Sequence, residues 1–150
     1  MENEKQIDLL NQLIEINNDR LEGYETAAEE TKATDLQTLF ANMKSTSYDN
    51  LQELRAEVER LGGKPAEGTM ISGKFFRVWM DVKAALSSDD RQTVLNSCEF
   101  GEDKALETYE KVLENDNSNH LSFEQIAMVK AQQENLRADH DRIKALRDAE

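Results

Sequence analysis

The sequence predicts a single all-α domain over residues 1–150. It should be a four-helix bundle in which two antiparallel helical hairpins are joined by a long crossover containing a short helix. The composition supports this, because 33% of residues are charged, 6% are aromatic, and there are six Gly and one Pro, which favours long helices over a β-rich fold. Apolar residues also recur at spacings of three and four in four long stretches. No linker is long enough to separate two domains.

The first hairpin is expected to occupy the first 63 residues. Its first helix should run from Glu4 to Thr31, and its second should begin at Thr34, which has the spacing of a capping box with Gln37. Gly62-Gly63 can end that helix in a left-handed C-cap. The residues expected to face the core of the first helix are Ile7, Leu10, Ile14, Asn17, Leu21, Tyr24 and Ala28. Those of the second are Leu36, Phe40, Met43, Ser47, Leu54, Val58 and Leu61.

The second hairpin follows a crossover. Residues 64–74 read as a loop, and the short helix from about Lys74 to Leu86 should pack one face on the bundle, through Phe75, Val78, Trp79, Val82 and Leu86. The third long helix should start at the capping residues 87–90. Its expected core residues are Leu95, Cys98, Glu102, Ala105, Tyr109 and Val112.

The last helix is expected to follow a polar turn at residues 115–119, with Ser122 and Gln125 forming a second capping box. Its expected core residues are Ile126, Val129, Gln133, Leu136, His140 and Ile143. Short loops make neighbouring helices antiparallel, whereas a join as long as the crossover can travel the length of the bundle. The third long helix should therefore run parallel to the second.

Charge and cysteine content narrow the classes of partner. The formal net charge of −13 disfavours binding to nucleic acid and to anionic membranes. No stretch approaches the ~20 apolar residues of a membrane span, and the N-terminal residues are polar with no apolar run behind them. The single Cys98 cannot form an internal disulfide, which fits a reducing compartment. A cytoplasmic location is the expectation.

Four segments resemble a bacterial family of the ferritin-like superfamily that is catalogued as a domain of unknown function. They are EINNDRLEGYE (residues 15–25), FRVWMD (76–81), CEFGED (98–103, with Tyr109 beyond it) and HDRIKALR (140–147). The resemblance covers nearly the whole chain and implies a ferritin-like bundle with a crossover. It implies no activity, although many ferritin-like relatives act in stress responses.

The ferritin-like fold directs attention to metal ligands inside the bundle. Di-iron members place a Glu on each of two helices and a Glu-x-x-His on each of the other two, a ligand set that suits iron or manganese. Glu25, Glu102 and His140 should lie at similar depths in their helices, so they are the candidate metal ligands. The chain departs from the pattern at Ser47, in the second helix, and at Arg137, where a Glu would precede His140.

Two functional hypotheses follow. In the favoured one the bundle is non-catalytic and acts by interaction or assembly, and Glu102, Glu25, Arg137 and His140 form a charge-compensated layer left from a metal-binding ancestor. In the alternative the same residues make an oxidase or a metal store. Either way Glu102 and His140 should lie within one hydrogen bond or one ion of each other. Phe76, Met80 and Phe100 should point away from the core, which suggests a homodimer contact.

Overall fold

The structure is a computed structural model that describes residues 2–69 and 73–150, and it describes the side chains of all of these except Glu2 and residues 73–76. The all-α prediction is confirmed, since the described residues form helices and no strand. The expected roles of the Phe75 and Phe76 side chains lie outside the described part of the chain. The helices are α1 (Glu2–Glu30), α2 (Thr34–Arg60), α3 (Gly73–Ser87), α4 (Arg91–Leu113), α5 (Asn115–Ser118) and α6 (Phe123–Asp148).

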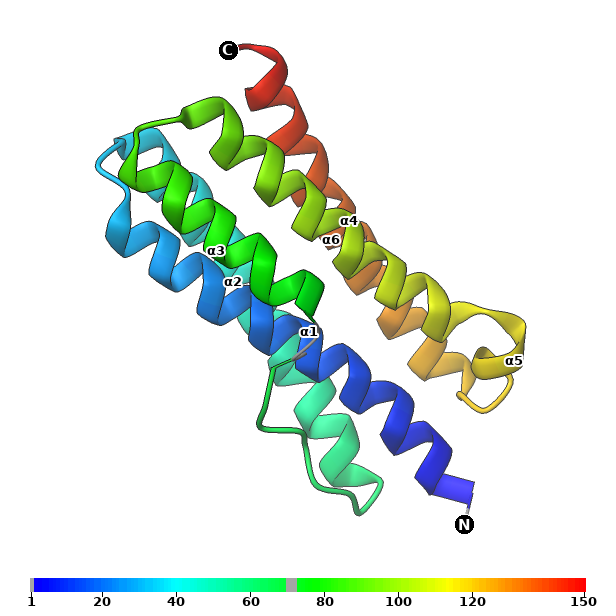
Figure 1. Ribbon diagram of the computed structural model, residues 1–150. Coiled ribbons are helices and arrows are strands. Elements are labelled where there is room, and N and C mark those ends of the chain that lie inside the picture. The colour runs from blue at the N-terminus through cyan, green and yellow to red at the C-terminus, as the bar shows by residue number, and fades with distance from the viewer. Residues whose placement is uncertain (1, 70–72) are drawn as a thin grey trace.

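Figure 1 shows α1 and α2 as one hairpin and α4 and α6 as another, with α3 lying along α1 and α4. Contacts at the helix ends define the directions. Arg91 at the start of α4 pairs with Asp35 at the start of α2, and Gln125 at the start of α6 donates to Glu57 near the end of α2 at 2.7 Å. Therefore α2 and α4 run in one direction, and α6 runs opposite to them.

Two capping boxes were expected, and one is present. Ser122 accepts from the backbone of Gln125, whose side chain bonds back to the Ser122 backbone, so that prediction is confirmed. The prediction of a capping box at Thr34 was wrong. The N-cap is Ala33, which is in the extended conformation, so Thr34 is already inside the helix. Its expected partner Gln37 instead donates to the Thr31 carbonyl at 3.1 Å.

Three asparagines of α1 hold the loop that follows α2. Gly62, which follows the C-cap residue Leu61, takes the left-handed conformation expected at the end of this helix, with φ of 83°. The chain then turns back along α1, where Asn3, Asn11 and Asn18 donate to backbone carbonyls within residues 61–68. These asparagines lie at near-heptad spacing and therefore on one face of the helix. They anchor a segment that has no regular structure of its own.

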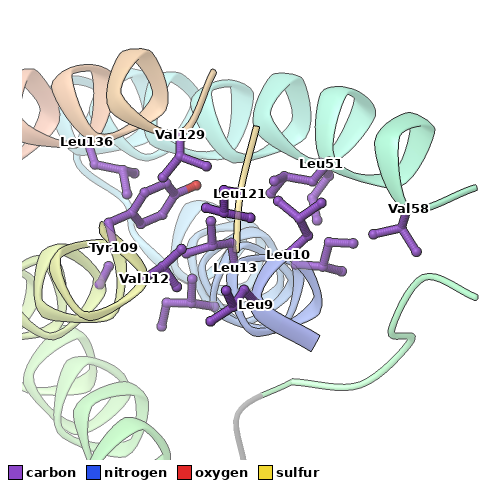
Figure 2. Packing of buried hydrophobic residues seen from close by; sticks show 14 of the residues in the cluster. Leu9, Leu10, Leu13, Leu51, Val58, Tyr109, Val112, Leu121, Val129 and Leu136 are labelled. Atoms are coloured by element: carbon purple, nitrogen blue, oxygen red, sulfur yellow. The ribbon is translucent and has the colours of Figure 1, made fainter. Parts of the chain in front are cut away.

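The apolar core is divided into two clusters. One lies toward the α5 end and draws from α1, α2, α4 and α6, as Figure 2 shows for residues such as Leu10, Leu51, Val112 and Val129. The other lies toward the α3 end and includes residues such as Tyr24, Phe40, Val82 and Ile143. Buried polar side chains that belong to neither cluster, among them Arg20 and Glu102, form the centre of the candidate site.

Candidate functional site

A buried arginine is the centre of the candidate site. Arg20 of α1 is only 2% exposed, and it lies on a stripe of α1 that contains Asn17, Tyr24 and Ala27, all of them buried. The spacing of three and four along this stripe directs these side chains into the bundle. A guanidinium in a protein core is costly unless its donors are paired, so its partners decide whether the arrangement is stable.

The Arg20 guanidinium contacts side chains from all three other long helices. Its Nε and Nη2 donate to the two carboxylate oxygens of Glu102 on α4, at 2.9 and 2.7 Å. Nη1 donates to Ser47 Oγ on α2 at 2.5 Å, and Nη2 also reaches Asp139 Oδ2 on α6 at 3.2 Å. We call Arg20, Ser47, Glu102 and Asp139 the arginine layer. Paired forks of this kind are the strongest hydrogen bonds that two side chains form.

Tyr24 links the arginine layer to the crossover helix α3. Its hydroxyl donates to Glu102 Oε2 at 2.8 Å, and its ring forms a T-shaped pair with Trp79, the centroids lying 5.0 Å apart. The Trp79 indole N–H in turn donates to Asp19 Oδ2 at 3.0 Å. A Cβ at Gly23 would lie 2.1 Å from the indole, so only glycine allows Trp79 to approach α1 so closely.

A second layer, made of amides and a phenol, lies one turn further along. Asn17 donates to the Tyr109 hydroxyl at 2.8 Å, and that hydroxyl donates to Gln132 Oε1 at 2.7 Å. Asn50 donates to Asn17 Oδ1 at 3.2 Å. We call these four residues the amide layer. Because each buried amide has a partner on another helix, the layer fixes how the helices are aligned.

The surroundings of the layers shift several pKa values. Burial alone would lower the pKa of Arg20, but the Glu102 carboxylate outweighs it and keeps the pKa above its ordinary value. Burial raises the pKa of Tyr24, and the negative Glu102 raises it further. Burial likewise raises the pKa of Asp139. The guanidinium therefore stays charged and the phenol stays protonated at every physiological pH, which leaves no ready proton donor or acceptor in Arg20 or Tyr24.

Asp19 gives a test of these electrostatics. Burial raises its pKa to about 6, although its hydrogen bond with Trp79 acts in the opposite direction. Folding therefore opposes ionisation of this carboxyl, and the penalty is complete above about pH 6 and absent below about pH 4.

We expect Asp19→Asn, which keeps an acceptor for Trp79, to raise the free energy of unfolding at pH 7 by about 1–3 kcal/mol. Urea titrations at pH 7 and pH 4 should show this gain shrinking toward zero at the lower pH. The exposed Asp81→Asn is the control, and a gain that does not depend on pH would contradict the assignment.

The three candidate metal ligands do not share a site. Glu25 is solvent-exposed, and its carboxylate lies 3.5 Å from Lys44 Nζ. Glu102 is buried in the arginine layer. His140 is half-buried, with Nε2 2.8 Å from Asp103 and Nδ1 3.1 Å from Asp141. Glu102 and His140 do not share a hydrogen bond, because their partners are different residues. Arg137, expected in the same layer, is exposed.

The position of His140 follows from the buried stripe of α6, which differs from the expected one. Val129, Leu136 and Ile143 are buried as expected, but the polar residues between them are Gln132 and Asp139 rather than Gln133 and His140. When buried apolar residues are seven positions apart, the core residue between them can lie either three or four positions after the first. In α6 the residue three positions after the first is the buried one. His140 is thereby turned toward α4, beside Asp103.

A group with metal-ligand spacing nevertheless exists at the edge of the α4–α6 contact. Glu99, Asp103 and His140 each offer a ligand atom, and these atoms lie within 4.8 Å of one another. Of the three, only His140 was singled out from the sequence. The signal for the others was their spacing of four on α4, which places both carboxylates on one face of the helix.

Cys98 and His120, the other histidine of the chain, belong to neither the arginine layer nor the amide layer. Cys98 is completely buried, and burial raises the pKa of its thiol, so the thiolate needed for nucleophilic attack is not formed. His120, in the segment between α5 and α6, is exposed. Among the helices that the structure describes, none has the length and apolar character needed to cross a bilayer.

The fold and its interior define an all-helical protein with a charged layer across its core. A family described as a domain of unknown function, DUF2383, matches residues 5–115. The chain therefore belongs to this family. The match includes Arg20, Tyr24, Ser47 and Glu102 and ends before α6, which supplies Asp139 and His140. A search of the curated proteins finds no match to the chain.

Proposed function

We propose that the protein is a ferritin-like bundle that acts by association and has no catalytic metal centre inside it. The observation that carries this proposal is the contact between Arg20 and both oxygens of Glu102. A ferritin-like metal pair is held by inward carboxylates and histidines from four helices. Here the arginine supplies the positive charge, and Glu102 has no oxygen free of a partner, since Oε2 also accepts from Tyr24.

The join between the two hairpins supports the ferritin-like part of the proposal. Since α2 and α4 run in the same direction, the crossover must return along the bundle, and α3 lies within that return. This is the connectivity of bundles with one long crossover. The alternative function, an oxidase or an iron or manganese store built on Glu25, Glu102 and His140, would require these residues to leave their present partners.

Comparing two substitutions of Glu102 tests the role of the arginine layer. If the layer is structural, Glu102→Gln should lower the free energy of unfolding less than Glu102→Ala, because the amide can still bond to Arg20 and Tyr24. Urea titrations of both variants measure this. In parallel, the iron and manganese content of protein purified without a histidine tag should not depend on Glu102. Stoichiometric metal that is lost in both variants, and also in Glu25→Gln, would overturn the proposal in favour of the metal centre.

The surface supports association more than catalysis. Met80 of α3 is 55% exposed and Phe100 of α4 is 48% exposed, and these two helices pack against each other. Met80 also lines a groove of about 560 Å³ between α1 and α3, together with Trp79 and Leu86. Large apolar side chains left in water on a small acidic protein are typical of contact surfaces.

We expect the association to be a homodimer. Sedimentation at micromolar concentration should give twice the chain mass of 17.1 kDa, and Met80→Lys or Phe100→Lys should return the monomer, because a charge would be buried at the contact. Tyr48→Lys is the matched control, since Tyr48 of α2 is 53% exposed but lies on another helix. A monomer throughout the micromolar range, or equal effects of all three substitutions, would contradict the proposed contact.

A further inference from the structure

We propose that Glu99 and Asp103 of α4 and His140 of α6 bind a divalent first-row transition-metal ion, with Zn²⁺ as the representative. The site lies at the edge of the α4–α6 contact and shares no residue with the arginine layer. It is independent of the association proposed above.

The geometry of the three ligands supports the site. Their ligand atoms lie within 4.8 Å of one another, close enough for modest side-chain rotation to bring all three to a single ion. His140 Nε2 is already 2.8 Å from Asp103 Oδ1. One imidazole nitrogen and two carboxylate oxygens form a ligand set that proteins use for zinc, with water completing the coordination.

The other ring nitrogen of His140 is held as metal-bound histidines usually are. Nδ1 lies 3.1 Å from Asp141 Oδ1, so in the tautomer that carries its proton on Nδ1 the ring can donate to this carboxylate. That tautomer leaves the Nε2 lone pair free for an ion. A carboxylate behind the ligating histidine fixes the ring orientation and makes the imidazole a better ligand.

Glu99 provides an observation independent of this clustering. Its Oε1 accepts from Arg147 Nη1 at 2.5 Å. Its Oε2 is buried and has no hydrogen-bond partner among the described residues, and it is the one such side-chain atom among them. A buried carboxylate oxygen without a partner is uncommon and needs a compensating group such as a water or an ion. A cation held jointly with Asp103 and His140 would supply that group.

The charge around the proposed site and its access to solvent also suit a divalent ion. The group contains the carboxylates of Glu99, Asp103 and Asp141, and the one guanidinium that pairs with any of them is that of Arg147, which contacts Glu99 and also Asp148. The local balance is therefore negative, as a divalent ion requires. Asp103 is half exposed and His140 is 17% exposed at the side chain, so an ion can enter from solvent without unfolding the bundle.

Calorimetric titration of the untagged full chain with ZnCl2 tests the proposal. We expect one strong site per chain. His140→Gln and Asp103→Asn should each weaken it at least tenfold, and Asp141→Asn should weaken it by about tenfold, as for other residues behind a metal ligand. His120→Gln is the matched histidine control and Glu110→Gln the matched carboxylate control on α4. Both residues are exposed, and neither substitution should change the affinity.

Two further measurements distinguish a specific site from non-specific attraction of cations and from misfolding of a variant. Circular dichroism of each variant should show unchanged helicity, because all the substituted side chains lie at the surface or its edge. Co²⁺ should give visible absorption bands that disappear in His140→Gln. Zinc that binds with equal affinity in His140→Gln and His120→Gln would mean non-specific attraction to a polyanion and would overturn the site. Absence of Zn²⁺ binding in the wild type would leave His140 as a hydrogen-bonding partner of Asp103 and Asp141, and would also overturn the site.

Discussion

Replacing Arg20 by Ala is expected to lower the free energy of unfolding by about 3–5 kcal/mol, the usual cost of removing one member of a buried ion pair. The loss arises chiefly from the carboxylates that stay in the core after the guanidinium is removed. Glu102 is only 1% exposed, and without the guanidinium its charge would keep only the Tyr24 hydroxyl as a partner. Asp139 would lose its contact with Arg20 as well. Urea titration followed by circular dichroism measures the change.

Two controls separate the ion pair from general effects of truncation. Arg91→Ala removes an arginine that pairs with Asp35 and Glu150 at the surface, and it should cost much less because solvent screens such pairs. The double variant Arg20→Met with Glu102→Leu should be less damaging than Arg20→Ala alone, since Glu102 no longer leaves a buried charge unpaired. A loss below about 1 kcal/mol for Arg20→Ala would mean that the layer is hydrated and that the bundle centre is not closed.

The helices themselves could be predicted from the sequence, because they depend on local signals. Spacing at three and four, the Gly62 C-cap and the Ser122 capping box each act within a few residues, and they placed the helix ends close to where they occur. The length of the crossover also indicated the direction of α4. These features need no knowledge of which residue on one helix meets which residue on another.

The site could not be predicted in the same way, because its charged pairs join residues 82 and 119 positions apart. On α1 the residues expected at the core included Asn17 and Tyr24 but did not include Arg20, which lies between them and is buried. Only the positions of Glu102 and Asp139 on other helices make that arginine acceptable in the interior. Buried charge is decided by tertiary partners, which one helix does not reveal.

The amide layer could not be fully predicted from the sequence either. Asn17 was expected at the core, and it is there, but the other two amides of the layer, Asn50 and Gln132, were not expected to be buried. Neutral amides satisfy one another in several arrangements, so a spacing pattern does not distinguish Gln132 from Gln133. The choice follows from Tyr109, whose hydroxyl reaches Gln132. One buried aromatic on α4 thus fixes which of two adjacent glutamines enters the core.

Replacing Trp79 by Ala is expected to cost about 3 kcal/mol or more of the free energy of unfolding, the range for truncating a large packed aromatic. Trp79 joins the crossover helix to α1. It bonds to Asp19, packs against Tyr24 and covers Gly23. Its loss would open a cavity beside the Tyr24 ring and leave Asp19 without its indole donor.

Gly23→Ala should reproduce much of this loss while Trp79 itself is kept, because the added methyl would occupy the space of the Trp79 ring. Met80→Ala is the control on the same helix, since Met80 is largely exposed and should change stability little. Thermal and urea unfolding of the three variants would rank them. If Trp79→Ala cost less than about 1 kcal/mol, α3 would be only loosely attached. Tyr24, and through it the arginine layer, would then be held in place by α1, α2 and α4 without the crossover.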